Sequence, residues 1–180
     1  MKKDDIEKRK AAFFEITEGK IGQDITERLE EMGFFMAPAS IRFHGSYEGG
    51  LFDHSLAVAE HLVRLTERNQ LQWKRHGKLA PVIVGMFHDL CKCDEYIVSK
   101  NGDIRWNPNT ELQGHGTKSV ILAKRLIDDL SDEEAMCIQY HMGAFTSQRE
   151  WGNYTAAVRR YPNVLWTHQA DMLASHVDGV

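Results

Sequence analysis

The segment Pro81-Val-Ile-Val-Gly-Met-Phe-His-Asp-Leu-Cys-Lys92 places a run of apolar residues directly before a His-Asp pair and a lysine. An apolar run this continuous predicts an element buried on most sides, and proline at its start is typical of the first turn of a helix. We therefore expect a buried helix from near Pro81 that carries His88 and Asp89 deep into the fold. A carboxylate there must be paired or bound to a cation, because an isolated buried charge is costly.

Length and composition limit the number of domains and the classes of partner that the chain can have. The chain has 180 residues, 42% of them hydrophobic, which is enough for one well-filled core and predicts a single domain over residues 1–180. A net charge of −4 gives no global reason to expect nucleic acid as a partner, although a local basic groove stays open. No stretch resembles a signal peptide or a membrane span, and three cysteines are too few for a disulfide framework. We expect a cytoplasmic protein without membrane contact.

Helical periodicity dominates the chain. It predicts helices over about 5–20, 21–32, 51–75, 117–130, 131–142 and 164–176, with mixed loop and short helix over 144–162. Ser131 and Glu134 have the spacing of a capping box, and Asn163 is expected to cap the last helix. The Asn101-Gly102 pair between two short β-prone segments is a strong hairpin signal. The expected fold is all-α, with a small β-hairpin insertion near 95–108.

Histidine and aspartate recur at or near the ends of the expected helices. Imidazole and carboxylate are the ligand set of Mn, Fe, Co, Ni or Zn, so we expect one or two divalent transition metals per chain. A cluster of this size has room for two metals ~4 Å apart, bridged by one carboxylate. Any one such histidine is more often a structural residue than a ligand, so the prediction requires the whole set to converge in space. The set is His54, His88, Asp89, His115, His141 and Asp171.

The order of these residues resembles a known signature. His54, then His88-Asp89, then Asp171 is similar to the pattern of the HD-domain superfamily of metal-dependent phosphohydrolases, an all-helical fold. The segment from His44 through Gly49-Gly50-Leu51 to His54 is similar to the Gly-Gly-Leu-containing entry to the first ligand helix in HD-domain exoribonucleases. The resemblance covers roughly residues 40–176, and it implies an HD core at 41–177 that follows a helical extension at 1–40.

Two further histidines sharpen the resemblance. Gly114-His115-Gly116 and His141-Met-Gly143 fall where binuclear HD proteins, including the cyclic-di-nucleotide phosphodiesterases, place two additional ligands. The chain lacks the Gly-Tyr-Pro signature of the phosphodiesterase branch, and it has Tyr140-His141 where that branch has a His-His pair. The resemblance thus implies two metals, but it does not extend to cyclic-di-nucleotide specificity.

The resemblance also implies a role for each residue. A first metal would be held by His54, His88, Asp89 and Asp171, with Asp89 bridging to a second metal at His115 and His141. Lys92 matches a lysine that follows the pair in many members and lies near the substrate phosphate; the alternative is a solvated lysine at a helix end.

Two further histidines and two cysteines are candidates for the site. His44 and His168 are expected substrate contacts, each weighed against an ordinary structural histidine. Cys91 and Cys93 lack a second cysteine pair, which favours packing over metal binding.

The leading hypothesis is a metal-dependent phosphohydrolase. Asp89 and Lys92 would be its catalytic residues, and the substrate would be a phosphate ester of a nucleotide or another small phosphorylated metabolite. A second hypothesis is an HD-type nuclease acting on RNA or DNA, which a basic groove beside the metals would favour. A third is a non-catalytic nucleotide or phosphate sensor, which would bind its ligand without hydrolysis. The oligomeric state stays open.

Overall fold

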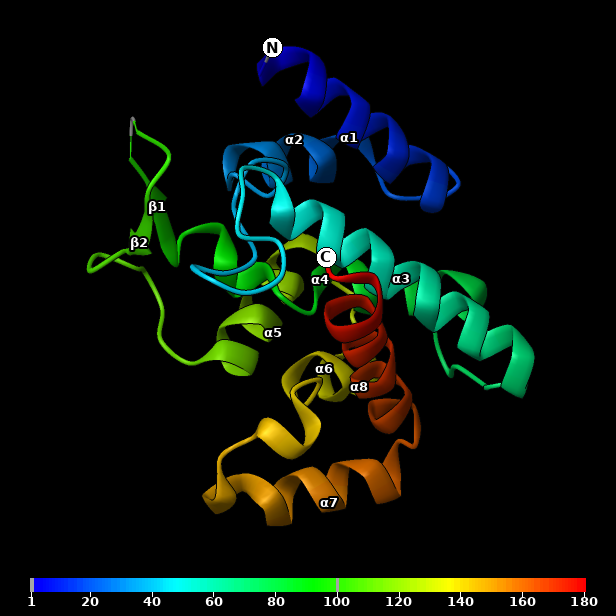
Figure 1. Ribbon diagram of the computed structural model, residues 1–180. Helices are drawn as coiled ribbons and strands as arrows, with labels where there is room; N and C mark the ends of the chain where they lie inside the picture. Colours follow the sequence, from blue (N-terminus) through cyan, green and yellow to red (C-terminus); the bar gives the residue numbers. More distant parts are fainter. Residues whose placement is uncertain (1, 100) are drawn as a thin grey trace.

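The computed structural model describes residues 2–99 and 101–180, and the fold is all-α with one small hairpin (Figure 1). This confirms the predicted fold class. The α-helices are α1 (Lys2–Ile16), α2 (Gln23–Glu31), α3 (Gly50–Asn69), α4 (Ala80–Phe87), α5 (His115–Leu126), α6 (Asp132–Gln139), α7 (Trp151–Arg160) and α8 (Asn163–Leu173). Short 3₁₀ turns lie at η1 (Gly77–Leu79), η2 (Leu90–Cys93), η3 (Gly143–Phe145) and η4 (Gln148–Glu150), and a π-helical turn, η5 (Ala174–Asp178), follows α8.

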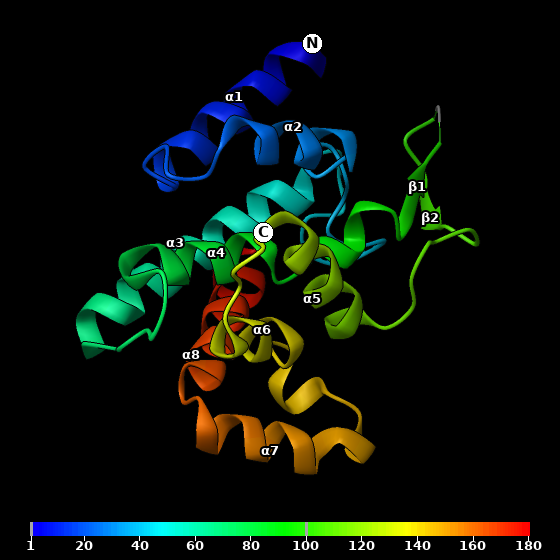
Figure 2. The same ribbon diagram turned by 180° about the vertical axis from the view of Figure 1, so that it is seen from behind.

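The centre of the fold is formed by α3, which packs against α4 and α8 (Figures 1 and 2). The predicted buried helix is confirmed as α4, which begins one residue before Pro81 and buries all of its residues. Because the helix ends at Phe87, the chain delivers His88 and Asp89 at the end of a fully buried element. Their exposed fractions are 0% and 2%.

Two glycines allow helices to approach closely beside these residues. A Cβ on Gly85 would lie 2.4 Å from Ala59 Cα, so only glycine lets α4 pack this closely on α3. A Cβ on Gly116 would lie 2.1 Å from the carbonyl oxygen of Gln139, so the start of α5 packs equally closely on the end of α6. The contact at Gly85 lies beside His54 and His88, and the contact at Gly116 lies beside His115 and His141.

The N-terminal helices share the hydrophobic core of the rest of the chain. Phe13 of α1 packs edge-on against Phe35, with ring centroids 6.1 Å apart, and stacks on Phe87 of α4 at 6.5 Å. Arg9 also pairs with Asp53 at the start of α3, at 3.1 Å. The division into an extension at 1–40 and an HD core at 41–177 stays a prediction.

The predicted hairpin is confirmed. β1 (Tyr96–Val98) and β2 (Ile104–Trp106) pair antiparallel, with Tyr96 opposite Trp106, and the hairpin projects to one side of the helical body (Figure 1). Lys100, between the two strands in the sequence, lies outside the described residues. Within the described ranges, no helix combines the length and the apolar character needed to cross a membrane.

Several helix ends differ from the predictions. The helix expected to reach residue 75 ends at Asn69, because Gln70 adopts a left-handed conformation with φ 53°. The helix expected from residue 117 begins at His115, and the segment expected as mixed loop and short helix contains the ten-residue helix α7.

The capping predictions had two outcomes. Ser131 and Glu134 form the predicted capping box. The prediction that Asn163 caps the last helix is wrong. Its side-chain amide donates instead to the Gln72 carbonyl at 2.9 Å and to Glu133 at 3.1 Å, which ties α8 to two other segments.

Candidate metal centre

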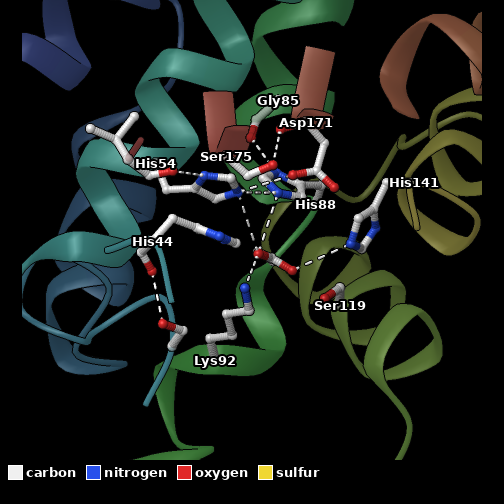
Figure 3. Close-up of polar contacts among 12 residues, drawn as sticks. His44, His54, Gly85, His88, Lys92, Ser119, His141, Asp171 and Ser175 are labelled. Atoms are coloured by element: carbon white, nitrogen blue, oxygen red, sulfur yellow. Dashed lines mark hydrogen bonds and ion pairs between the residues drawn. The ribbon is translucent and has the colours of Figure 1, made fainter. Parts of the chain in front are cut away.

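All six residues predicted as metal ligands meet in one buried cluster, which we call the His/Asp cluster. They arrive from five segments: the first turns of α3, the end of α4, the start of α5, the end of α6, and α8. Figure 3 shows His54, His88, His141, Asp171 and Lys92 directed toward a common centre.

The first group within the cluster is centred on His54. Its Nε2 lies 3.2 Å from His88 Nε2 and 3.3 Å from Asp171 Oδ1. Asp89 Oδ2 lies 3.7 Å from His54 Nε2 and 3.4 Å from His88 Nε2. His54, His88 and Asp89 therefore surround one small volume, and Asp171 joins this group through its contact with His54.

The second group is centred on the other oxygen of Asp89. Oδ1 lies 2.9 Å from His115 Nε2 and 3.4 Å from His141 Nε2, and these two nitrogens are 3.0 Å apart. Asp89 thus directs one oxygen to each group. This is the placement that a carboxylate bridging two metals requires.

Backbone acceptors fix the tautomers of three of these histidines. The Nδ1 atoms of His54, His88 and His141 lie 2.9, 2.7 and 2.7 Å from the carbonyl oxygens of Val180, Gly85 and Ile138. A carbonyl only accepts, so each Nδ1 carries the proton. In a neutral imidazole Nε2 then presents a lone pair, here toward the centre of the cluster.

This donor set fits a cation. The lone pairs of His54 and His88 face each other at 3.2 Å, an arrangement that is repulsive unless a positive charge lies between them. Asp89 Oδ1 is buried and accepts no hydrogen bond from the described residues, although His115 Nε2 is 2.9 Å away. Ligands bound ~2.0–2.1 Å from one metal are separated by about 3.0–3.4 Å, close to the spacing seen here. The cluster can therefore bind metal.

Lys92 is part of the cluster and is not a solvated lysine. Its Nζ lies 2.6 Å from Asp89 Oδ2, and the residue is only 8% exposed. Burial lowers the pKa of Lys92, but the Asp89 carboxylate outweighs that effect and raises it. Burial likewise favours a higher pKa for Asp89, but Lys92 and His88 hold it well below its ordinary value. Because Lys92 is buried and paired with Asp89, the alternative of an ordinary solvated lysine is wrong.

The two histidines predicted as substrate contacts lie next to ligand residues. The His44 ring packs against the His54 ring at a tilt of 35°, with centroids 4.7 Å apart, and burial, together with His54 and Lys92, lowers the pKa of His44 to about 4. His168 donates from Nδ1 to the carbonyl oxygen of His141 at 2.9 Å and so holds the backbone of that residue. Contact of either histidine with substrate stays a prediction.

A separate cavity of about 850 Å³ lies along the second half of α3, beside Trp73 and Lys78. None of the six residues of the His/Asp cluster lines it. The charged residues that line this cavity form no group comparable to the His/Asp cluster. The His/Asp cluster is therefore the better candidate for the functional site.

Sequence reasoning missed the backbone partners of the ligands, and Gly179 is the clearest case. It adopts φ +77° and directs the Val180 carbonyl toward His54, and a Cβ there would meet nothing within 4 Å. We expect Gly179→Val to lower metal affinity about tenfold, because a β-branched residue in this conformation costs ~1–2 kcal/mol and displaces the carbonyl. Gly179→Asn should retain affinity, since asparagine tolerates positive φ. Metal titration by calorimetry measures both.

The matched control is Gly77→Val. Gly77 has φ +52° and equally open surroundings, but it lies at the opposite end of α4 from His88. This variant should lose stability without losing metal affinity. Equal affinity in Gly179→Val and Gly179→Asn would show that the Val180 carbonyl does not position His54.

Comparisons with known proteins do not add a relative: no family model, no curated protein and no solved structure matches the chain. The chemistry of the His/Asp cluster is therefore the basis for a functional proposal.

Proposed function

We propose that the protein is a metal-dependent phosphohydrolase of the HD type, acting on a phosphate ester of a nucleotide or another small phosphorylated metabolite. The observation that carries this proposal is Asp89, whose two oxygens face two separate pairs of histidine nitrogens. Two cations held on one carboxylate suit an in-line displacement at phosphorus, since one can orient the attacking oxygen and the other the leaving oxygen.

The residues of the cluster would have different roles in binding the cations. His54, His88, Asp89 and Asp171 would hold the first cation, and Asp89, His115 and His141 the second. Bound divalent cations supply a hydroxide nucleophile at neutral pH and offset charge on the phosphoryl oxygens. Lys92 keeps Asp89 ionised and adds a fixed positive charge beside it.

Substrate would reach the cluster on the side of His115 and Asp171. The side chain of His115 is 31% exposed and that of Asp171 14%, whereas the side chains of His54, His88 and His141 are at most 1% exposed. The open side of the cluster thus lies next to the second group and to α8.

The decisive experiment pairs elemental analysis with a hydrolysis screen. Protein purified without chelator is analysed for Mn, Fe, Co, Ni and Zn, and then tested on bis-p-nitrophenyl phosphate, nucleotides and single-stranded RNA. Bound metal with release of phosphate from small esters supports the proposal. Cleavage of RNA alone would assign the nuclease hypothesis instead. Tight nucleotide binding without hydrolysis would assign a sensor, and a chain that binds no metal would overturn the metal-centre assignment.

Single replacements should separate the two groups. We expect two metals per chain in the unmodified protein and one in either His54→Gln or His141→Gln, because each removes a nitrogen from one group only. Hydrolysis should fall by at least 100-fold in both, as expected for loss of one of two cooperating cations. His76→Gln is the control, since His76 pairs with Glu134 and Asp129 outside the cluster. Two metals retained in His141→Gln would remove the second group from the proposal.

A further inference from the structure

His115 differs from the other three histidines of the cluster in what its Nδ1 faces. For those three the partner is a backbone carbonyl, but His115 Nδ1 lies 3.2 Å from the Cys91 sulfur. The same sulfur lies 3.8 Å from Glu95 Oε2. A thiol, a carboxylate and an imidazole nitrogen therefore surround a second small volume, at the ring nitrogen of His115 that does not face the His/Asp cluster.

We propose that Cys91, Glu95 and His115 form a separate site for a thiophilic cation such as Zn²⁺, and that this site competes with the His/Asp cluster for His115.

The geometry and the donor types both suit such an ion. With Zn–S of about 2.3 Å and Zn–N or Zn–O of about 2.0–2.2 Å, tetrahedral ligand atoms lie ~3.3–3.6 Å apart. The Cys91 sulfur lies 3.2 Å from His115 Nδ1, just below that range, and 3.8 Å from Glu95 Oε2, just above it. Thiolate favours zinc over manganese, whereas the nitrogen and oxygen donors of the His/Asp cluster accept either.

An ion can reach this site from solvent. Cys91 is 1% exposed, but Glu95 is half-buried and the side chain of His115 is 31% exposed. Cys91 and Glu95 are held on η2 and the residues just after it, between the His88-Asp89 pair and the hairpin. The site is therefore open to solvent on the side of Glu95 and His115.

Occupation of this site has a consequence for the cluster, and this part of the inference rests on the proposed function. Neutral imidazole has one lone pair, so His115 can present it from Nδ1 to the thiophilic site or from Nε2 to the second group, but not from both. Zn²⁺ bound at Cys91 would take His115 away from the second cation. Micromolar Zn²⁺ should then slow hydrolysis supported by Mn²⁺.

The site is tested directly with Cd²⁺, whose bonds to thiolate give an ultraviolet charge-transfer band. The His/Asp cluster is first loaded with Mn²⁺, so that Cd²⁺ must draw His115 away from the second group, and Cd²⁺ is then titrated. We expect a band that saturates at one Cd²⁺ per chain in the unmodified protein and in Cys93→Ala, whose thiol is only two residues away. Cys91→Ala should lose the band, and Glu95→Gln should bind Cd²⁺ at least tenfold more weakly.

Each outcome decides the proposal. A band that is absent from the unmodified protein, or that persists in Cys91→Ala, overturns it. Because Cys91 is buried, circular dichroism must show that Cys91→Ala is folded; if it is not, unchanged Cd²⁺ affinity in Glu95→Gln overturns the proposal by itself. Failure of the proposed function has a different signature, namely no Mn²⁺ binding and no hydrolysis with the Cd²⁺ band intact.

Discussion

Asp89→Asn is expected to abolish metal binding and to destabilise the metal-free protein by about 3–5 kcal/mol, the cost of removing one partner from a buried ion pair. The asparagine keeps the shape of the side chain but removes the charge opposite Lys92, whose Nζ lies 2.6 Å from Asp89 Oδ2. It also removes the carboxylate that faces both histidine groups. Urea unfolding measures the free energy, and elemental analysis measures the metal.

A second replacement separates these two effects. Asp89→Asn/Lys92→Met removes both members of the ion pair and fills the space of Lys92 with an unbranched apolar chain, so most of the lost stability should return. Metal binding should not return, because the bridging carboxylate is still missing. Recovery of metal in the double variant would mean that Asp89 is a structural partner of Lys92 and not a ligand. If stability does not return, the unpaired charge of Lys92 is not the cause of the stability lost in Asp89→Asn.

Bound metal is expected to stabilise this fold strongly. At a free concentration 1,000 times the dissociation constant, a cation that binds only the folded chain adds about 4 kcal/mol to the free energy of unfolding. For a domain of this size that corresponds to a rise in Tm of about 8–16 °C. The physical reason is that the cation replaces the lone-pair repulsion between His54 Nε2 and His88 Nε2, 3.2 Å apart, with bonds to the metal.

Thermal unfolding with and without Mn²⁺, Co²⁺ or Zn²⁺ measures this shift, and EDTA should reverse it. With Mn²⁺, Asp89→Asn serves as the control and should show a shift of less than about 2 °C. A shift of equal size in that variant would place the stabilising cation outside the His/Asp cluster. Mn²⁺ is the most informative ion, because it has little affinity for the Cys91 site.

The sequence predicted the elements of this site better than the contacts that orient them. An apolar run ending in His88-Asp89 specifies burial, because no other placement removes that much hydrocarbon from water. Helical periodicity then placed His54, His141 and Asp171 near helix ends or on α8. Their convergence could not be derived from spacing, since it depends on two close helix contacts at Gly85 and Gly116.

The acceptors of the histidine Nδ1 protons left no signal in the sequence at all. Backbone carbonyls occur at every position, so nothing distinguishes Val180 or Ile138 as a partner before the chain is folded. The prediction that Asn163 caps α8 fails for a related reason. Its side chain satisfies a buried carboxylate and a carbonyl from other segments, and that tertiary demand outweighs the local preference of asparagine for a helix cap.

The contact between His54 and Val180 also has a consequence for the order in which the protein is made. The two residues are 126 positions apart, and Asp171 lies near the later one. At a synthesis rate of about 5–20 residues per second, roughly 6–25 s separate the translation of His54 from that of its acceptor. A nascent or truncated chain thus holds His54 and His88 without the carbonyl and carboxylate that complete their group. Capture of the first metal would consequently require that the chain has been translated through α8 and Val180, so metal content would report the folding of this region onto α3.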